Sequence, residues 1–403
     1  MDSLIQVLGQ ALDMVEIDFL GATTNHGKRI AVLCAAMGRR LGMSTLEVSD
    51  LVSCALLHDN ALTEYILMRE GREEDDPNFG AHCEYGQRNM ESLPFNGNID
   101  GYILYHHEQA DGLGPFKLME GEYPLGAELI AVADMLDAEK HLENFSQAKL
   151  PSLRENIRTK IHVCFTDRAG NALLDVLDEE MHASLQNEKI LETARNSIPA
   201  WTMEMNNPGL MPIAELISRI IDYKSAFTGM HTQQIANRTW LMSEYYGYDP
   251  EEKIQLYLAA ALHDIGKLSI PSEVLEKPGA LDKEEFEIIQ SHAAQTRSLL
   301  SGMDGLGHIT EWASNHHEKL DGSGYPLGRT AGDLDFNSRL MICIDIYQAV
   351  SEKRPYHPGR SHAENMPILS TMAENGKIDP AIVKDLDKVM AEWSGREVET
   401  PRV

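Results

Sequence analysis

Histidine and aspartate side chains recur in this 403-residue chain at spacings that suit metal chemistry. One set consists of His231, His263, Asp264, His292, His316, His317 and Asp345. Imidazole nitrogens and carboxylate oxygens, with no cysteine among them, suit divalent ions such as manganese, iron or zinc. Seven such groups exceed the needs of one tetrahedral ion. They fit two neighbouring ions, with one aspartate bridging them.

A second set with the same spacing lies about 205–211 residues earlier. It consists of His26, His58, Asp59, His82, His106, His107 and Asp134. Residues 106–116 read HHEQADGLGPF, and residues 316–326 read HHEKLDGSGYP. A single buried His or Asp is more often an ordinary core or capping residue. Seven at matched spacing in each copy instead indicate a tandem repeat.

The elements that must position these side chains are predicted to be helices. The segments 4–15 (LIQVLGQALDMV) and 30–43 (IAVLCAAMGRRLGM) place apolar residues three and four apart, as amphipathic helices do. Segments that read as alternating strands are absent from the sequence. The length and the 43% apolar content fit two cores. We expect an all-α fold of two helical bundle domains, 1–185 and 213–403, joined by a partly helical linker at 186–212.

Charge and cysteine usage narrow the partners and the compartment. The net charge of −28 argues against duplex nucleic acid, and an anionic small molecule would need metals or local cations to bind. Five cysteines without a C-x-x-C pair are expected to be free thiols in a reducing compartment. Neither a signal peptide nor an 18-residue apolar run is found. We expect a cytoplasmic protein with no membrane contact, compatible with a homodimer.

Two short motifs carry a resemblance to a known family. Residues 263–267 (HDIGK) resemble the HDxGK signature of the HD superfamily of metal-dependent phosphohydrolases. Residues 316–326 are similar to the HHExxxGxGYP signature of the HD-GYP family, with every defining position filled. The resemblance is strong over 213–360 and weaker over 20–145. It implies an all-α bundle with a binuclear metal centre that hydrolyses a cyclic dinucleotide, cyclic di-GMP or 3′,3′-cyclic GMP-AMP.

The resemblance also assigns the ligands to two ions. His231, His263, Asp264 and Asp345 would hold one ion, and His292, His316 and His317 the other, with Asp264 bridging. Iron or manganese is favoured, with zinc, nickel or magnesium as alternatives. Some members hold a third ion through a Glu one turn before the first His. Phe227 occupies that position here, so we expect two ions.

Further residues are expected to handle the substrate. Lys267 would stabilise or protonate a phosphate oxygen, whereas an ordinary helix-end cation is the plainer alternative. Gly324, Tyr325 and Pro326 would form a rigid lip beside the substrate, against the alternative of a surface turn. The resemblance suggests that Arg339 and Arg354 organise the site or touch phosphate. A structural salt bridge is an equal alternative for each arginine.

The expected reaction is hydrolysis of a phosphodiester to a linear dinucleotide. A hydroxide bridging two divalent ions is a strong nucleophile near neutral pH, and the ions neutralise charge on the phosphate oxygens. Two alternatives stay open. One is an HD phosphohydrolase acting on another nucleotide, such as ppGpp or a dNTP. The other is a non-catalytic tandem HD scaffold.

The first copy keeps its ligands but departs elsewhere. Leu62 stands where the second copy has Lys267, and Pro115–Phe116 replaces Tyr325–Pro326. Glu128 and Glu143 fall at the positions of Arg339 and Arg354. We therefore expect a metal-capable shell with little hydrolytic activity, used for regulation, dimerisation or ligand sensing. A second active site, with charge supplied by Arg88 and Lys117, is the alternative.

Overall fold

The computed structural model describes residues 2–69, 80–198, 209–225, 230–277, 279–301, 303, 305–354 and 357–393. These residues form helices, apart from the short antiparallel pair β1 (Lys353–Arg354) and β2 (His357–Pro358). The predicted all-α fold is confirmed. The chain divides into two compact units, Met1–Thr202 and Met203–Val403. No helix in the described part of the chain combines the length and apolarity that a membrane span requires.

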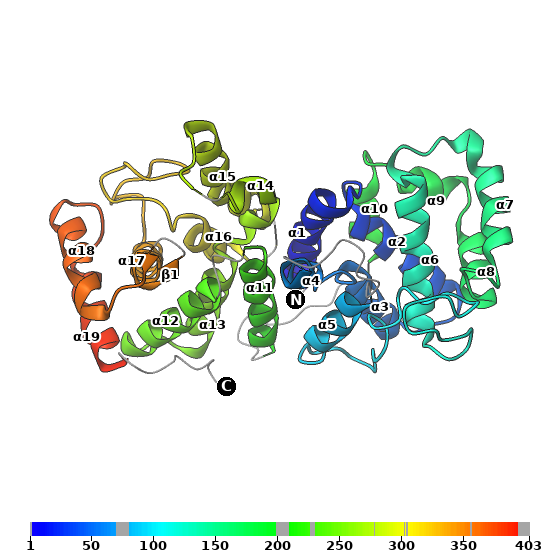
Figure 1. Ribbon diagram of the computed structural model, residues 1–403, viewed down its shortest axis with the longest axis horizontal. Helices are drawn as coiled ribbons and strands as arrows, with labels where there is room; N and C mark the ends of the chain where they lie inside the picture. Colours follow the sequence, from blue (N-terminus) through cyan, green and yellow to red (C-terminus); the bar gives the residue numbers. More distant parts are fainter. Residues whose placement is uncertain are drawn as a thin grey trace. The chain divides into compact units, whose positions relative to one another are not determined.

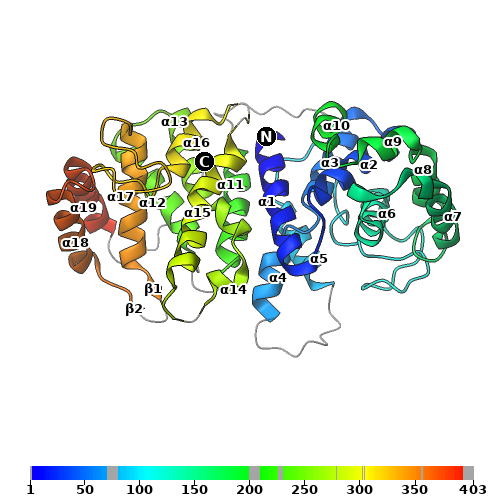
Figure 2. The same ribbon diagram turned by 90° about the horizontal axis from the view of Figure 1, so that it is seen from above.

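Helix α2 (His26–Arg40) lies at the centre of the first unit (Figure 1 and Figure 2). It packs against α3, α6, α8 and α10, and its residues Ile30–Ala35 are buried. The surrounding helices are α1 (Asp2–Leu20), α3 (Thr45–Leu56), α4 (Leu62–Arg69), α5 (Ala81–Met90), α6 (Leu125–Lys140), α7 (Leu150–Lys160), α8 (Asp167–Val176), α9 (Glu179–Ser184) and α10 (Ile190–Ser197). The short 3₁₀ turns η1 (Leu142–Asn144) and η2 (Gln147–Lys149) connect α6 to α7.

The segment predicted as a linker, 186–212, begins with packed structure. Helix α10 packs against α2 through the buried side chains of Ile190 and Ala194. Because these apolar side chains lie against the core of the first unit, residues 190–197 are part of that unit rather than a tether. The structure describes the chain again from residue 209.

Helix α13 (Pro250–Leu262) is the central helix of the second unit, and it packs against α11, α12 and α16. Its residues Leu256–Leu262 have no exposed surface, which explains why the segment reads as uniformly apolar. The other elements are α11 (Leu210–Tyr223), α12 (His231–Tyr245), η3 (Ile265–Ser269), α14 (Ser272–Leu275), α15 (Lys283–Leu300), α16 (Gly307–Ser314), α17 (Phe336–Ser351), α18 (His362–Glu374) and α19 (Pro380–Trp393).

Helix starts and stops place the histidines. In both units a buried aspartate caps the helix that begins with the first histidine. Asp13 Oδ1 accepts a hydrogen bond from the Gly27 N–H at 2.7 Å, and Asp222 Oδ1 accepts one from the Thr232 N–H at 2.9 Å. Helix α13 starts with a capping box between Asp249 and Glu252 and ends directly before His263.

Gly266 brings the turn after α13 against helix α15. A Cβ atom at this position would lie 2.0 Å from the carbonyl oxygen of His292 and 2.7 Å from the backbone nitrogen of Thr296. Both atoms belong to the backbone of α15, so neither can rotate away. The absence of a side chain at residue 266 therefore allows His263 and Asp264 to approach His292.

Replacing Gly266 with Ala should destabilise the second unit by at least about 2 kcal/mol, because the new methyl group overlaps backbone atoms. Denaturant unfolding followed by tryptophan fluorescence measures this, since Trp240, Trp312 and Trp393 all lie in the second unit. Gly307→Ala is the matched control. No atom lies within 4 Å of its added Cβ, and the residue starts α16. Equal stability of the two variants would contradict the close-approach argument.

Candidate metal centres

The seven predicted ligands of the second unit converge around Asp264. Its Oδ2 lies 3.1 Å from His263 Nε2 and 3.6 Å from His231 Nε2. Its Oδ1 lies 3.3 Å from His292 Nε2 and 3.7 Å from His316 Nε2. The two oxygens of one carboxylate therefore face two different groups of imidazoles, which is the geometry that a bridging ligand needs.

Asp345, on α17, contacts the two histidines of this centre that lie farthest along the chain from each other, His231 and His317. Its Oδ1 lies 3.7 Å from His231 Nε2, and its Oδ2 lies 3.4 Å from His317 Nδ1. The resemblance grouped Asp345 with the first ion alone. In the structure the Asp345 carboxylate reaches both groups of imidazoles, because α17 passes beside both the start of α12 and the loop after α16.

Backbone carbonyls orient three of the imidazoles. The Nδ1 atoms of His263, His292 and His316 each lie 2.6 Å from the carbonyl oxygen three residues earlier. A carbonyl oxygen only accepts, so each Nδ1 carries the proton and donates it. Each Nε2 is left with a lone pair directed into the centre, as a metal ligand requires.

The donor atoms fit divalent ions. The Nε2 atoms of His292 and His316 lie 3.2 Å apart, and both carry lone pairs. His263 Nε2 and Asp264 Oδ1 are buried and have no hydrogen-bond partner. Facing lone pairs and unpartnered buried acceptors are unfavourable unless a cation lies between them. The centre is thus built to surround cations.

Electrostatics favours the protonation states that metal ligands need at His292, His316 and Asp264, whereas Asp264 raises the pKa of His263 and burial raises the pKa of Asp345. Burial lowers the pKa of His292 to about 4 and holds the pKa of His316 well below its ordinary range. Burial opposes ionisation of Asp264, but His263 and Lys267 hold the pKa of its carboxyl group well below the usual value. These two imidazoles are therefore neutral and the carboxylate is charged near neutral pH.

Lys267 and the predicted lip lie beside the centre. Lys267 Nζ is 2.5 Å from Asp264 Oδ2, and the centroid of the Tyr325 ring is 4.8 Å from that of His317. The Tyr325–Pro326 peptide bond is cis. A Cβ atom at Gly324 would lie 2.4 Å from Glu318 Cα, so only glycine allows the lip to lie this close to the ligand segment.

Glu318, directly after the His316–His317 pair, anchors the lip. Its Oε1 accepts a hydrogen bond from the Leu327 N–H at 2.7 Å, and its Oε2 accepts one from the Arg329 N–H at 2.9 Å. In the first unit, Glu108 accepts hydrogen bonds from the N–H groups of Phe116 and Leu118 at 2.7 and 2.6 Å. The repeated Glu therefore fixes the loop backbone in both copies, a role that the sequence comparison did not assign.

The two predicted arginines, Arg339 and Arg354, were expected to organise the site or touch phosphate. The Arg339 guanidinium donates to the carbonyl oxygens of Leu334 and Ala331 at 2.9 and 2.6 Å and pairs with Asp379 at 3.3 Å. These contacts support the structural alternative for Arg339. The backbone of Arg354 lies in β1, but its side chain is outside the described part, as is Phe227.

The first unit repeats this arrangement around Asp59 and Asp134. Asp59 Oδ1 lies 3.4 Å from His82 Nε2 and 3.8 Å from His106 Nε2, and its Oδ2 lies 3.8 Å from His58 Nε2. Asp134 Oδ1 lies 3.1 Å from His26 Nε2, and its Oδ2 lies 4.0 Å from His107 Nδ1. All seven predicted ligands of the first unit are brought together.

Carbonyl oxygens also orient imidazoles in the first unit. His58 Nδ1 lies 3.0 Å from the carbonyl oxygen of Ala55, and His106 Nδ1 lies 2.6 Å from that of Ile103. A carboxylate performs the same task for the first histidine of each unit. His26 Nδ1 lies 2.7 Å from Asp137 Oδ2, and His231 Nδ1 lies 2.7 Å from Glu352 Oε1.

Two further donors in the first unit were missed from the sequence. Glu16, on α1, groups with His26 and His58, and Cys83 groups with His82, His106 and His107. Within each group the ligand atoms lie within 4.8 Å of one another. A signal existed for Glu16, because it is an acidic residue on the buried face of an apolar helix. The signal for Cys83 was its position directly after the predicted ligand His82.

The acidic replacements in the first unit are engaged with neighbours. Glu128 accepts hydrogen bonds from Thr166 Oγ1 at 2.9 Å and from Arg168 Nη2 at 3.3 Å. Glu143 Oε2 lies 3.9 Å from Arg29 Nη2. The charge of Glu128 is therefore matched by Arg168, so Glu128 is not a free negative charge beside the first centre.

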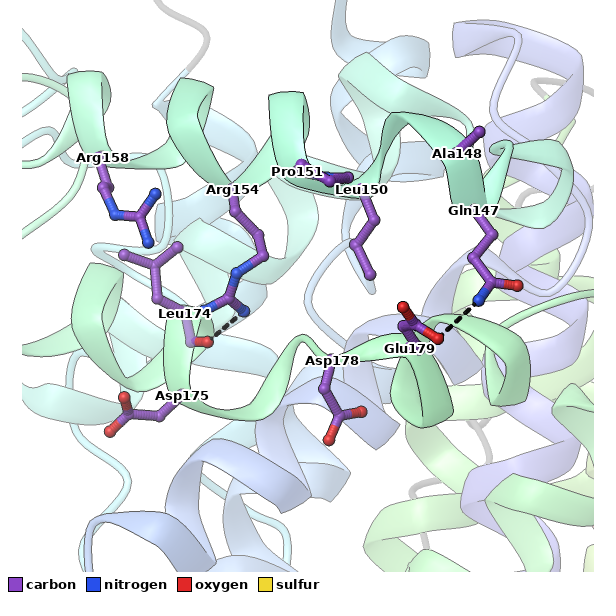
Figure 3. A pocket seen from close by; sticks show the side chains of 10 residues that line it. All are labelled: Gln147, Ala148, Leu150, Pro151, Arg154, Arg158, Leu174, Asp175, Asp178 and Glu179. Carbon is purple, nitrogen blue, oxygen red and sulfur yellow. Dashed lines mark hydrogen bonds between the residues drawn. The ribbon is translucent and has the colours of Figure 1, made fainter.

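The described residues of the first unit line a cavity beside its centre and another farther from it. One, of about 320 Å³, opens on the ligands His106, His107 and Asp134, and the residues that line it include no Lys or Arg. A larger one, of about 930 Å³, lies between the η2–α7 segment and α8–α9 (Figure 3). Arg154 Nη1 donates there to the carbonyl oxygens of Leu174 and Leu177. None of the predicted ligands lines this larger cavity.

Replacing Glu352 with Ala should weaken metal binding by the second unit about 10–100-fold, because His231 would lose the carboxylate that orients it. Titration of the metal-free full chain with Mn²⁺, followed by electron paramagnetic resonance, measures the affinity. Glu374→Ala, an exposed Glu on α18, is the control. If both variants bind Mn²⁺ like the unaltered chain, Glu352 does not orient a ligand.

Known proteins resemble this chain over most of its length. A family model described as "HD domain" matches residues 13–155 and 215–382. The 3′3′-cGAMP-specific phosphodiesterase 1 of Vibrio cholerae is 29% identical over 93% of this chain and 88% of that protein. The 3′3′-cGAMP-specific phosphodiesterase 3 of the same organism is 28% identical over 82% of this chain and 72% of that protein.

A solved structure shares the fold. The crystal structure of V-cGAP3, a cyclic GMP-AMP-specific phosphodiesterase of V. cholerae, matches with a TM-score of 0.66 and 22% identity, and the match covers 97% of each chain. The family model matches both units and more than half of the residues. Each matched segment contains all seven of its unit's converging His and Asp residues. This chain therefore belongs to the HD domain family.

Proposed function

We propose that this chain is a metal-dependent phosphodiesterase that opens a cyclic dinucleotide to the linear dinucleotide, with its chemistry in the second unit. The observation that carries the proposal is the buried centre around Asp264, with Lys267 and the Tyr325–Pro326 lip beside it. Two relatives that match most of this chain are named 3′3′-cGAMP-specific phosphodiesterases. We therefore place 3′3′-cGAMP first among substrates, ahead of cyclic di-GMP.

The seven predicted ligands of the second unit would hold two divalent ions, and iron or manganese is favoured. Asp264 would be the ligand shared by both ions, because its two oxygens face different imidazoles. When bound, the ions supply Lewis-acid activation of water and neutralise charge on the phosphate. The five imidazoles are uncharged ligands, so only the two carboxylates offset the positive charge of the ions. The loaded centre would therefore keep a net positive charge, which attracts an anionic substrate.

The residues around the centre bind and orient the phosphodiester. Lys267 Nζ pairs with Asp264 and therefore lies beside the centre. From there it would donate a hydrogen bond or a proton to an oxygen of the bound phosphate. The Tyr325 ring, which is tilted against the His317 ring, forms the wall against which the substrate lies. Gly324 and Pro326 hold this wall in place, and Arg339 pins the loop that follows it. Arg354 is assigned to phosphate contact.

The first unit is assigned a regulatory role. It keeps a complete ligand shell but has Leu62 where the second unit has Lys267, and Leu62 is buried. The cavity that opens on its ligands is about 320 Å³, at the small end for a ligand site, and lacks cationic lining residues. A dianionic dinucleotide is a poor fit there. The free thiols of the described cysteines support the expected cytoplasmic location.

The test of catalysis is turnover by purified protein loaded anaerobically with Fe²⁺ or Mn²⁺. We expect 3′3′-cGAMP to be converted to linear dinucleotide, with slower conversion of cyclic di-GMP, as measured by chromatography. His263→Ala and Asp264→Ala should abolish turnover, because each removes a ligand of the centre. Failure to hydrolyse any cyclic dinucleotide, together with hydrolysis of ppGpp or a dNTP, would transfer the chain to another class of HD phosphohydrolase.

Variants of the first unit separate regulation from catalysis. His58→Ala combined with Asp59→Ala should leave the chemistry in place but change the rate or its response to added metal, because these residues shape only the first centre. Steady-state kinetics across a Mn²⁺ series is the measurement. Identical kinetics and metal response to the unaltered chain would show that the first centre does not regulate. Complete loss of turnover in a folded variant would show instead that it is catalytic.

A further inference from the structure

Cys83 distinguishes one half of the first centre from its counterpart. It follows His82 on α5 and has no exposed surface. The equivalent residue in the second unit, 210 positions later, is Ala293, which is also buried. A small side chain suffices for packing at this place, so the sulfur of Cys83 is an addition that packing does not require.

The sulfur lies among ligand atoms. Cys83 Sγ is 3.5 Å from His82 Nε2, and it forms one group with the nitrogens of His82, His106 and His107. A tetrahedral zinc ion with ordinary Zn–S and Zn–N bonds holds its ligand atoms about 3.4–3.6 Å apart. The spread of the group, up to 4.8 Å, closes to this value with small side-chain rotations.

A second observation points to a cation at the same place. The Nδ1 atom of His106 donates to the carbonyl oxygen of Ile103 at 2.6 Å, so the Nε2 atom carries a lone pair. This Nε2 is buried and has no hydrogen-bond partner, and the residue has no exposed surface. Asp59 Oδ1, 3.8 Å away, is likewise a buried acceptor without a hydrogen-bond donor. A buried nitrogen lone pair and a buried carboxylate oxygen that face each other are unfavourable unless a metal ion or a proton lies between them.

We infer that His82, Cys83, His106 and His107 form a thiolate-containing position that selects zinc or a similarly sulfur-seeking ion. The use of this metal position in regulation rests on the regulatory role proposed for the first unit. The binding of the metal by these four residues does not. Thiolate is a soft ligand that favours zinc, whereas the all-histidine and carboxylate shell of the second unit suits iron or manganese. One chain therefore offers two metal positions of different selectivity.

The first centre also contains more acidic groups than the second centre. Glu16 lies with its Oε2 3.8 Å from His26 Nε2, buried and without a hydrogen-bond partner. Glu16, Asp59 and Asp134 together with the Cys83 thiolate offset the charge of two dications. The second unit has only Asp264 and Asp345 among its predicted ligands. The first centre is thus close to neutral when loaded, which suits retention of ions rather than attraction of an anionic substrate.

The test uses Co²⁺ as a spectroscopic probe of the metal-free full chain. Thiolate bound to Co²⁺ gives a sulfur-to-metal charge-transfer band in the near ultraviolet, which histidine and carboxylate ligands do not give. We expect this band in the unaltered chain and its loss in Cys83→Ala, the residue that the second unit carries at this place. Cys164→Ser, a half-buried cysteine outside the group, should keep the band.

Zinc content provides the second measurement. After equal exposure to Zn²⁺ and dialysis against a weak chelator, Cys83→Ala should retain one zinc ion fewer per chain than Cys164→Ser. Far-ultraviolet circular dichroism of the metal-free proteins checks that both variants are folded, and Cys83→Ser offers a second variant of closer size. A missing band in the unaltered chain, or a band that survives in Cys83→Ala and Cys83→Ser, overturns the inference.

This inference and the proposed catalysis fail separately. Loss of the charge-transfer band reports on Cys83 alone and involves no substrate. If the unaltered chain hydrolyses no cyclic dinucleotide but shows the Cys83-dependent band, the catalytic proposal fails and the thiolate position stands. If turnover is present but the band is absent, the reverse holds.

Discussion

The structure depends on one hydrogen bond that is repeated in both units. An imidazole Nδ1–H donates to the carbonyl oxygen three residues earlier, as in His263, His316 and His106. This bond holds the ring and directs the lone pair of Nε2 inward. It is available only where helical or turn geometry places that carbonyl beneath the ring. These histidines lie within a helix, as His292 does, in a turn directly after one, as His263 and His316 do, or in a turn of the loop between α5 and α6, as His106 does, and the surrounding helices bring these places together.

Much of this could be predicted from the sequence. The matched spacings identified the seven His and Asp residues that converge in each unit, because a repeated fold repeats the positions of its shared side chains. The apolar periodicity predicted helices, and the buried run of α13 follows from its lack of a polar face. The lip was predicted from its motif, and Gly324 proves to be required by the 2.4 Å approach to Glu318.

Other contributors could not be found by comparing the two copies, because tertiary packing brings them in. Asp137, in the last turn of α6, orients His26, and Glu352, directly after α17, orients His231. Glu16 and Cys83 occur in one copy only, so a search for shared residues passes over them. The contacts of Arg339 could not be predicted, because the fold determines which groups lie beside its guanidinium. These groups are the carbonyl oxygens of Leu334 and Ala331 and the carboxylate of Asp379.

Glu108 and Glu318 have a consequence for how such a chain diversifies. Each glutamate holds its loop through main-chain N–H groups alone, so the bond is indifferent to which side chains the loop carries. A loop that reads GLGPF in one copy and GSGYP in the other is fastened in the same way. The side chains of this loop can therefore differ between copies, or be exchanged by loop grafting, while the main-chain attachment is kept.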